Sequence, residues 1–420
     1  MSRGYWRFWI VAVACIVLLG ANQVMAEGKV LKVGVLAPLT GPSAETGQQY
    51  KSAVTMAMEK IGYKVGDYKL DLVWIDSQSD PAKASAAYAE AVERGGIQVG
   101  LLDWNSSTSV AVMDVAAHYK IPHMFSQGAT ELVNQKYKNE PAKYSYWGGK
   151  GWPIPGHLMK GYVETLNKAI ETGAFKPAKK TVAIYGEDTD WGRSACGAFK
   201  QEFKNTGWEV ISEDYFPTSQ TDFYPLVSKY KKAGVAAVAG TSTSLPSMTA
   251  FIKQSQEVGL KSIIIADGLG WVGDWYKLTG EASDGVVDMI PQLASPQAKE
   301  WAKAFEAKFQ IKPSPSTGGI PYDLTNFFIK VLGHALNKYS KLDKETIYKV
   351  MVEEVNTGKL TYSSAEGAII MKNYRYDATS FPDPVLGPDA YFFPIIQYNG
   401  GKGEIVYPPD MATKKLEVRQ

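Results

Sequence analysis

Short β-branched and apolar runs alternate with segments of helical spacing along most of this chain, and this alternation most limits how it can fold. In the first part, buried strands are predicted at 30–36, 70–75, 97–102 and 121–125. Helical length and spacing are found between them, at 47–61, 81–94 and 107–119. Strands that alternate with helices are typical of a parallel sheet covered by helices on both faces. The sequence therefore predicts an α/β fold.

A stretch rich in proline and glycine, residues 146–156, interrupts the pattern before it resumes. Further strands are predicted at 181–185, 209–211, 235–239 and 262–266, and further helices at 192–205, 223–232 and 247–258. Three more helices are predicted at 296–310, 322–339 and 344–355, before a strand-like tail. The chain is expected to form two doubly wound lobes, each a mostly parallel sheet flanked by helices.

The first 26 residues have the features of an export signal. Arg3 and Arg7 precede a short apolar run at 8–19, and the small residues that end at Ala26 offer a cleavage site. The run is shorter than the roughly 20 residues that cross a bilayer, and no later stretch approaches that length. Cleavage after Ala26 and export are expected. In the alternative, Cys15 would carry a lipid, but the residues before it fit that signal poorly.

Charge and cysteine content exclude several classes of partner and of fold. The chain has 45 Lys and Arg against 43 Asp and Glu, and the excess of two lies in the leader, so the mature chain is formally neutral. Such a chain lacks the basic excess that nucleic acid or an anionic membrane surface would attract. Of the two cysteines, only Cys196 follows the leader, which excludes an internal disulfide. Stability must come from a large core.

Six segments, in this order and at these spacings, resemble the periplasmic solute-binding proteins of the leucine/isoleucine/valine-binding type. They are residues 33–42, 76–81, 105–108, 126–130, 188–192 and 400–409. The resemblance covers nearly the whole mature chain. It implies the type I periplasmic binding protein fold, in which three chain crossings join two lobes as a hinge, and a periplasmic location.

The resemblance also implies where the lobes divide. The crossings would lie near residues 148–152, 284–291 and 357–360. The first lobe would then comprise residues 27–150 and 288–357, and the second lobe residues 151–287 and 358–420. A ligand enclosed between the lobes would close them by a hinge motion.

The function implied by the resemblance is that of a receptor for an ABC importer. The receptor would capture a small amphipathic ligand, an amino acid or a related carboxylate that could be aromatic. It would deliver this ligand to an inner-membrane permease with its ATPase subunits. The alternative is a periplasmic sensor of the same fold that signals to a regulatory partner.

Signals of enzymatic, cofactor or metal chemistry are weak. Residues 268–273 fit the GxGxxG pattern of dinucleotide sites, but they come late in an exported chain and are interpreted as a loop beside the cleft. The four histidines lack metal-ligand spacing and cannot complete a site with nucleophile and base. The acidic loop 187–190 lacks the ligand spacing of a calcium loop. No catalytic residue, cofactor or metal is expected.

A carboxylate site is predicted after two strands of the first lobe. Ser106 and Thr130 each stand where a strand gives way to a helix, so they offer hydroxyls and free backbone amides to an anion. The resemblance implies contacts from Asn105 or Ser106, and from Gly128 and Thr130. Capping of the following helices is the alternative for the serine and threonine.

The rest of the predicted site concerns the apolar and cationic parts of a ligand. Trp191 aligns with an aromatic residue that covers the ligand in the family, and Trp104 lies in a loop near the cleft, as do Trp152, Trp271 and Trp275. Asp267 is the candidate partner of a ligand ammonium, with a strand-end cap as the alternative. The resemblance places two aromatic residues of the family near Thr46 and Ser244, where this chain has smaller side chains. An aromatic or bulky acid is therefore a candidate ligand beside leucine.

Overall fold

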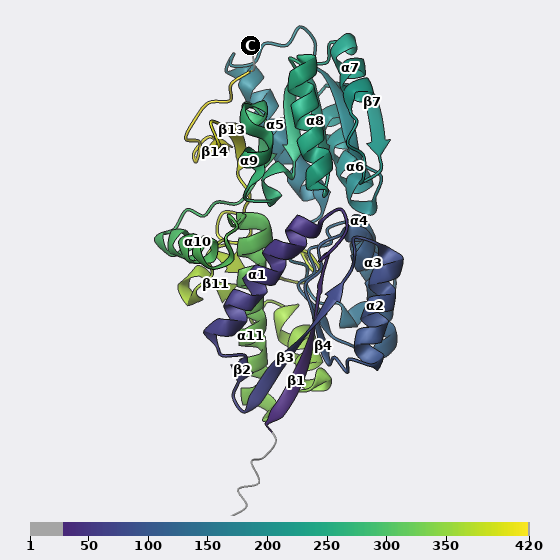
Figure 1. Ribbon diagram of the computed structural model, residues 1–420, viewed down its shortest axis with the longest axis vertical. Coiled ribbons are helices and arrows are strands. Elements are labelled where there is room, and N and C mark those ends of the chain that lie inside the picture. The colour runs from purple at the N-terminus through teal and green to yellow at the C-terminus, as the bar shows by residue number, and fades with distance from the viewer. Residues whose placement is uncertain (1–27, 419–420) are drawn as a thin grey trace, which may run out of the picture.

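The computed structural model describes residues 28–418, which form two α/β lobes stacked along the long axis of the molecule (Figure 1). The first lobe is built on a five-stranded sheet of order β2-β3-β1-β4-β5. Its strands run parallel, except that the short β2 is antiparallel to β3. They are β1 (Lys29–Ala37), β2 (Lys64–Val65), β3 (Tyr68–Asp76), β4 (Val99–Leu101) and β5 (His123–Met124).

Helices cover both faces of this sheet. Alternate residues of β1, such as Val33 and Val35, pack in the same core as Tyr50 and Val54 of α1, whereas Leu36 belongs to the core under α2 and α3. Asp80 caps α2 by accepting the N–H groups of Ala82 and Lys83, both at 2.9 Å. The helices are α1 (Ala44–Lys60), α2 (Pro81–Glu93), α3 (Ser106–Tyr119) and α4 (Glu131–Asn139).

The second lobe has a seven-stranded sheet of order β14-β13-β10-β9-β8-β6-β7. Strands β6 to β10 pair in parallel, and β13 and β14 form an antiparallel edge. The strands are β6 (Thr181–Glu187), β7 (Glu209–Phe216), β8 (Ala237–Thr241), β9 (Ile263–Asp267), β10 (Val287–Met289), β13 (Ile395–Asn399) and β14 (Lys402–Tyr407).

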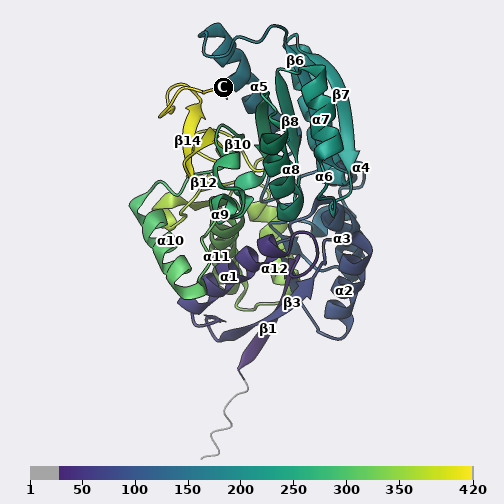
Figure 2. The same cartoon turned by 45° about the horizontal axis from the view of Figure 1, so that its top comes forward.

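Two pairs of helices flank this second sheet, as Figure 2 shows. Helix α5 packs on α6, and α7 packs on α8. Their bounds are α5 (Pro155–Glu171), α6 (Asp190–Asn205), α7 (Tyr224–Ala233) and α8 (Leu245–Val258), and the short α9 (Trp275–Thr279) lies beside α8. The predicted fold class, two mostly parallel sheets flanked by helices, is confirmed.

After β10 the chain returns to the first lobe. Helices α10 (Pro296–Phe309) and α11 (Ile320–Tyr339) both pack against α1. The π-helical turn η4 (Pro315–Gly319) precedes α11 directly. Helix α12 (Lys344–Val350) packs on α11 and continues as a second π-helical turn, η5 (Met351–Val355). The small hairpin of β11 (Tyr362–Ser363) and β12 (Asn373–Tyr374) follows.

The strand pairing bears on where the lobes divide. Strand β10 pairs with β9 and β13, so residues up to Met289 share the second sheet. Asp323 of α11 accepts the N–H of Ile369 at 2.9 Å and the hydroxyl of Tyr374 at 2.7 Å, which ties the β11–β12 hairpin to the first lobe. We therefore propose that the second crossing follows Met289 and that the third lies between β12 and β13.

The leader and its cleavage site lie outside the described residues. Within residues 28–418, no helix has both the length and the apolar character that a membrane crossing requires.

Candidate ligand-binding site

The carboxyl ends of the parallel strands in both lobes point toward the level where the lobes meet. In Figure 1, β1 rises toward this level and β7 descends toward it. Ligands of open α/β sheets bind outside the carboxyl ends of the strands, where loops lead into helices. The loops after β4, β5, β6, β8 and β9 therefore form the candidate site.

A small cavity lies between these loops. The first lobe contributes residues from the loops after β4 and β5. The segment between α4 and α5, where the first crossing is predicted, contributes Trp152, and the second lobe contributes the remainder. The lining residues are Trp104, Ser106, Gln127, Trp152, Trp191, Thr243 and Trp271. The four indoles are 2–6% exposed, so the chain itself encloses most of this cavity.

Trp271 is the centre of the apolar wall. Its ring centroid lies 5.0 Å from that of Trp104, 6.3 Å from that of Trp152 and 5.8 Å from that of Trp191. The first two pairs are nearly perpendicular, at 84° and 90°, which is the edge-to-face arrangement that aromatic pairs favour. Four rigid faces from both lobes and a crossing therefore meet at one point.

The polar groups of the cavity lining are hydrogen-bond donors. The Ser106 Oγ accepts the N–H groups of Ala129 at 3.1 Å and Thr130 at 3.2 Å, which leaves its own proton to donate. Tyr50 donates to Oε1 of Gln127, so the Nε2 of Gln127 is the end that remains unpartnered. The indole Nε1 atoms of Trp104 and Trp271 also lack a partner among the described residues. Buried donors without partners are costly, so they point to a ligand with acceptor atoms.

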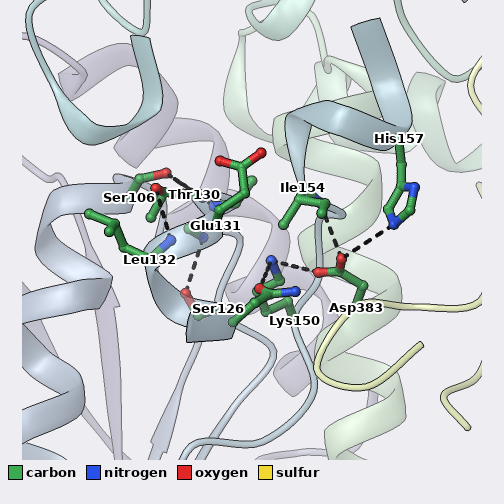
Figure 3. A network of polar contacts seen from close by, with 12 residues as sticks. Ser106, Ser126, Thr130, Glu131, Leu132, Lys150, Ile154, His157 and Asp383 are labelled. Atoms are coloured by element: carbon green, nitrogen blue, oxygen red, sulfur yellow. Dashed lines mark hydrogen bonds and ion pairs between the residues drawn. The ribbon is translucent and has the colours of Figure 1, made fainter. Parts of the chain in front are cut away.

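Of the residues predicted to hold a carboxylate, Ser106 lines the cavity, and the others lie around it. Thr130 caps α4 by accepting the N–H of Leu132 at 3.3 Å (Figure 3). A side chain at Gly128 would place its Cβ 2.0 Å from the Ser109 Oγ, so packing requires glycine there. Asn105 donates to Ser43 at 3.3 Å.

Among the other predicted site residues, Trp104 and Trp191 line the cavity, but Asp267 does not. Its carboxylate accepts from Tyr162 at 2.7 Å and from Thr241 at 3.1 Å. Burial, with the charge of Asp288 as the second cause, raises the pKa of Asp267 to about 8. Asp267 is thus held by protein groups, with no free oxygen turned to a ligand ammonium.

Sequence reasoning did not name Gln127 and Thr243 as site residues. Gln127 stands between Ser126 and Gly128 in a segment that carried the family resemblance, so its position beside the cleft could have been predicted from that segment. Thr243 is fixed by Glu187, which accepts its backbone N–H at 2.6 Å. Ser244 caps α8, and Thr46 is buried in α1, so neither position lines the cavity.

Comparison with known sequences decides the family. The profile of the family described as "Periplasmic binding protein" matches residues 30–375. The chain belongs to the periplasmic binding protein family. This periplasmic binding protein is a binding protein and not an enzyme, and membership of the family places it in the periplasm.

Two curated relatives show how far the sequence similarity extends. The Leu/Ile/Val-binding protein homolog 6 of Brucella suis is 26% identical over 257 residues, which cover 60% of this chain and 61% of the relative. The alignment thus spans about three fifths of that protein. The Leu/Ile/Val-binding protein homolog 8 of Brucella abortus is 24% identical over 407 residues and 93% of both chains.

Solved structures share the fold at lower identity. A putative branched-chain amino acid ABC transporter protein from Silicibacter pomeroyi has a TM-score of 0.71 and 15% identity, over 93% of this chain and 99% of that one. A solute-binding protein of Rhodopseudomonas palustris in complex with 3,4-dihydroxybenzoic acid has a TM-score of 0.70 and 21% identity, over 88% and 94%. A substrate-binding protein of Streptococcus pneumoniae in complex with isoleucine has a TM-score of 0.69 and 16% identity, over 90% of this chain and 98% of that one.

In this periplasmic binding protein, a buried ion pair lies at the first crossing (Figure 3). The Nζ of Lys150 lies 2.6 Å from Oδ1 of Asp383 and 2.7 Å from Oδ1 of Asn134. The N–H of Ile154 donates to Asp383 at 3.5 Å, and His157 lies 4.0 Å from it. Asp383 therefore binds the chain on both sides of Trp152, a wall of the cavity.

Direct hydrogen bonds also join the two lobes around the cavity. Ser43 donates to the carbonyl of Thr243 at 3.1 Å, and Ser314 donates to the carbonyl of Gly270 at 2.8 Å. The N–H of Asp190 donates to Ser107 at 3.2 Å. The lobes are thus in contact on more than one side of the candidate site.

Proposed function

We propose that this protein is the solute receptor of an ABC importer and that its ligand is a small aromatic carboxylate without an ammonium group. One observation carries the ligand assignment: the cavity is lined by four indoles and by uncharged polar groups, with no carboxylate among them. Export with cleavage after Ala26 and delivery to a permease with its ATPase subunits belong to the same proposal.

The acids nearest the lining are occupied by protein donors. Asp103 accepts the N–H of Trp104 and the hydroxyl of Ser109, both at 2.7 Å. Glu187 accepts from Thr243, and Asp267 accepts from Tyr162. An α-amino acid would bury its ammonium without an acidic partner, which is costly. An acid that lacks the amine avoids this cost.

The unpartnered donors suit the carboxylate of such a ligand. The hydroxyl of Ser106 and Nε2 of Gln127 can donate to its two oxygens, and bonds to a charged acceptor are stronger than bonds between neutral groups. The indole faces can enclose an aromatic ring. Solved proteins of this fold hold either 3,4-dihydroxybenzoic acid or isoleucine, so the fold admits both classes and the lining selects between them.

Calorimetric titration tests the ligand class. Benzoate, 4-hydroxybenzoate and 3,4-dihydroxybenzoate are compared with isoleucine, leucine and phenylalanine. At least one of the benzoates should bind with micromolar affinity, about 8 kcal/mol, and the amino acids should be at least tenfold weaker. Tighter binding of any of the amino acids would contradict the proposal.

Gln127→Glu sharpens the test because it replaces a donor amide by a carboxylate of the same shape. The variant should lose about 1.5–3 kcal/mol of affinity for the acid or more, since a charge-assisted hydrogen bond is replaced by repulsion between two carboxylates. Gln397→Glu is the matched control: Gln397 is buried in the second sheet and bonds Gly285 and Glu417, away from the cavity. Equal losses in both variants would show a general effect of a buried charge.

A further inference from the structure

Two buried carboxylates, Asp267 and Asp288, lie on neighbouring strands under the loop that carries Trp271. The hydroxyl of Tyr162, from α5, lies 2.7 Å from Oδ1 of Asp267 and 3.3 Å from Oδ1 of Asp288. A tyrosine has a single proton to donate, so it cannot serve both carboxylates at once. The two acids are therefore linked through one bridging hydroxyl.

Asp288 holds the Trp271 loop from below. Its carboxylate accepts the N–H groups of Gly268 at 3.1 Å and Gly270 at 2.8 Å, and the hydroxyl of Tyr398 at 2.7 Å. Gly268 has φ of 107°, a conformation that favours glycine. The GxGxxG segment thus wraps around a carboxylate of the protein itself, and Trp271 takes its position from that contact.

Asp267 connects the same network to Trp191, the other tryptophan that the second lobe contributes to the cavity lining. Thr241 accepts the indole N–H of Trp191 at 2.9 Å. The hydroxyl of Thr241 lies 3.1 Å from Oδ2 of Asp267 and 2.9 Å from its backbone carbonyl. A continuous path of polar contacts therefore runs from Trp191 through Asp267, Tyr162 and Asp288 to the loop of Trp271.

No cation compensates these two acids within residues 28–418, where neither forms an ion pair. The titratable groups around Asp267 are Asp288 of β10, Tyr162 of α5, Tyr185 of β6 and Tyr398 of β13. Burial raises the pKa of each tyrosine, so these remain neutral. Burial also raises the pKa of both acids, and two like charges so close disfavour double ionisation.

We propose that Asp267 and Asp288 share one proton through Tyr162, and that this proton sets the positions of Trp191 and Trp271 in the cavity wall. Asp288, with its three backbone N–H donors, stays ionised, and Asp267 carries the proton beside the Tyr162 hydroxyl. Loss of the proton places a second charge in the network and displaces both indoles. The effect on ligand affinity rests on the proposed function, whereas the proton itself does not.

Tryptophan emission of the ligand-free protein tests the proton directly. Between about pH 6 and about pH 9, the wild type should show a transition near pH 8, the pKa of Asp267, apart from any that Asp103 and Asp323 give near pH 7. Asp267→Asn, which mimics the protonated acid, should remove this transition. Tyr162→Phe removes a bond that lowers the pKa of Asp267, so its transition should move to higher pH. A wild type without a transition, or an unchanged transition in either variant, would overturn the inference.

Ligand titrations over the same pH range test the consequence for binding. Affinity of the wild type for the benzoate that binds should fall at least threefold above the transition, and Asp267→Asn should bind equally well throughout. Asp323→Asn is the control, because Asp323 is also buried but bonds Tyr374 in the first lobe. It should keep the wild-type pH profile. If the emission shows the transition but no benzoate binds, the proposed ligand is wrong and the shared proton is still supported. If a benzoate binds with an affinity that does not change with pH, the proton does not control the cavity wall.

Discussion

Two regions beside the cavity bury carboxylates, and they neutralise them in different ways. At the first crossing, Asp383 pairs with the ammonium of Lys150, which is itself fully buried. Under Trp271, Asp288 and Asp267 have each other as neighbours, and we propose that a proton takes the place of a cation. The first arrangement places a cation beside its acid, whereas the second changes charge near pH 8. One cavity can thus have one wall, Trp152, beside an ion pair, and two walls, Trp191 and Trp271, beside a shared proton.

The largest expected effect comes from removing the cation at the crossing. Lys150→Met leaves Asp383 buried without its partner, and breaking a buried pair in this way costs about 3–5 kcal/mol of unfolding free energy. Lys29→Met is the control, because Lys29 pairs with Asp67 at the surface, with both side chains more than half exposed, and it should leave stability nearly unchanged. Denaturant unfolding measures both. Equal losses would mean that Asp383 is neutralised by something other than Lys150.

The next effect is the pH dependence of stability, to which the acid pair should contribute. Native Asp267 keeps its proton up to about pH 8, whereas an unfolded aspartate loses it near pH 4. Between these values the native state binds more protons, so the free energy of unfolding falls as pH rises. Asp103 and Asp323, whose burial raises their pKa to about 7, add to the same slope.

The contribution of Asp267 is therefore measured as a difference. Unfolding free energies of the wild type and Asp267→Asn should be compared at several pH values between about 4 and 8. The wild type should lose stability more steeply than the variant over this window, and the two curves should run parallel above it. Parallel curves throughout would place an ionised Asp267 in the native state and remove the contrast with the crossing.

The smallest effect concerns the helix that joins the crossing to the cavity loops. Thr130→Ala removes the cap of α4, which also carries Asn134, a partner of Lys150. The expected cost is about 1 kcal/mol of stability, typical of a lost cap, with unchanged ligand affinity. Thermal unfolding and calorimetric titration separate the two quantities. A variant that melts normally but binds the ligand at least tenfold more weakly would show that Thr130 contacts the ligand carboxylate.

Much of the fold could be predicted because buried parallel strands appear in the sequence as continuous apolar runs. The predicted strand at 181–185 lies within β6, and 263–267 differs by one residue from its prediction. Strand β7 extends to Phe216, well beyond the predicted 209–211, because it lies at a sheet edge and carries polar residues such as Glu213 and Asp214. The two-residue strands β2 and β11 are too short to show any periodicity.

The candidate site could be predicted only in part, for a physical reason. Ser106, Trp104 and Trp191 follow strand ends, and that position brought them to the cavity. Asp267 also ends a strand, but its side chain is directed by Tyr162 and Asp288, which lie far from it in the sequence. Local sequence gives the place of a residue along a strand, whereas the groups it contacts belong to helices and strands from other parts of the chain.

The enclosure of the cavity has a consequence for the time that a ligand stays bound. With four indoles only 2–6% exposed and with bonds such as Ser314 to Gly270 joining the lobes, we expect these contacts to block the exit of a bound molecule. Escape then requires the lobes to part, so the rate of opening sets an upper limit on dissociation for every ligand. Chemically different ligands that differ widely in affinity should therefore share a similar maximum off-rate, and Ser314→Ala should raise that limit.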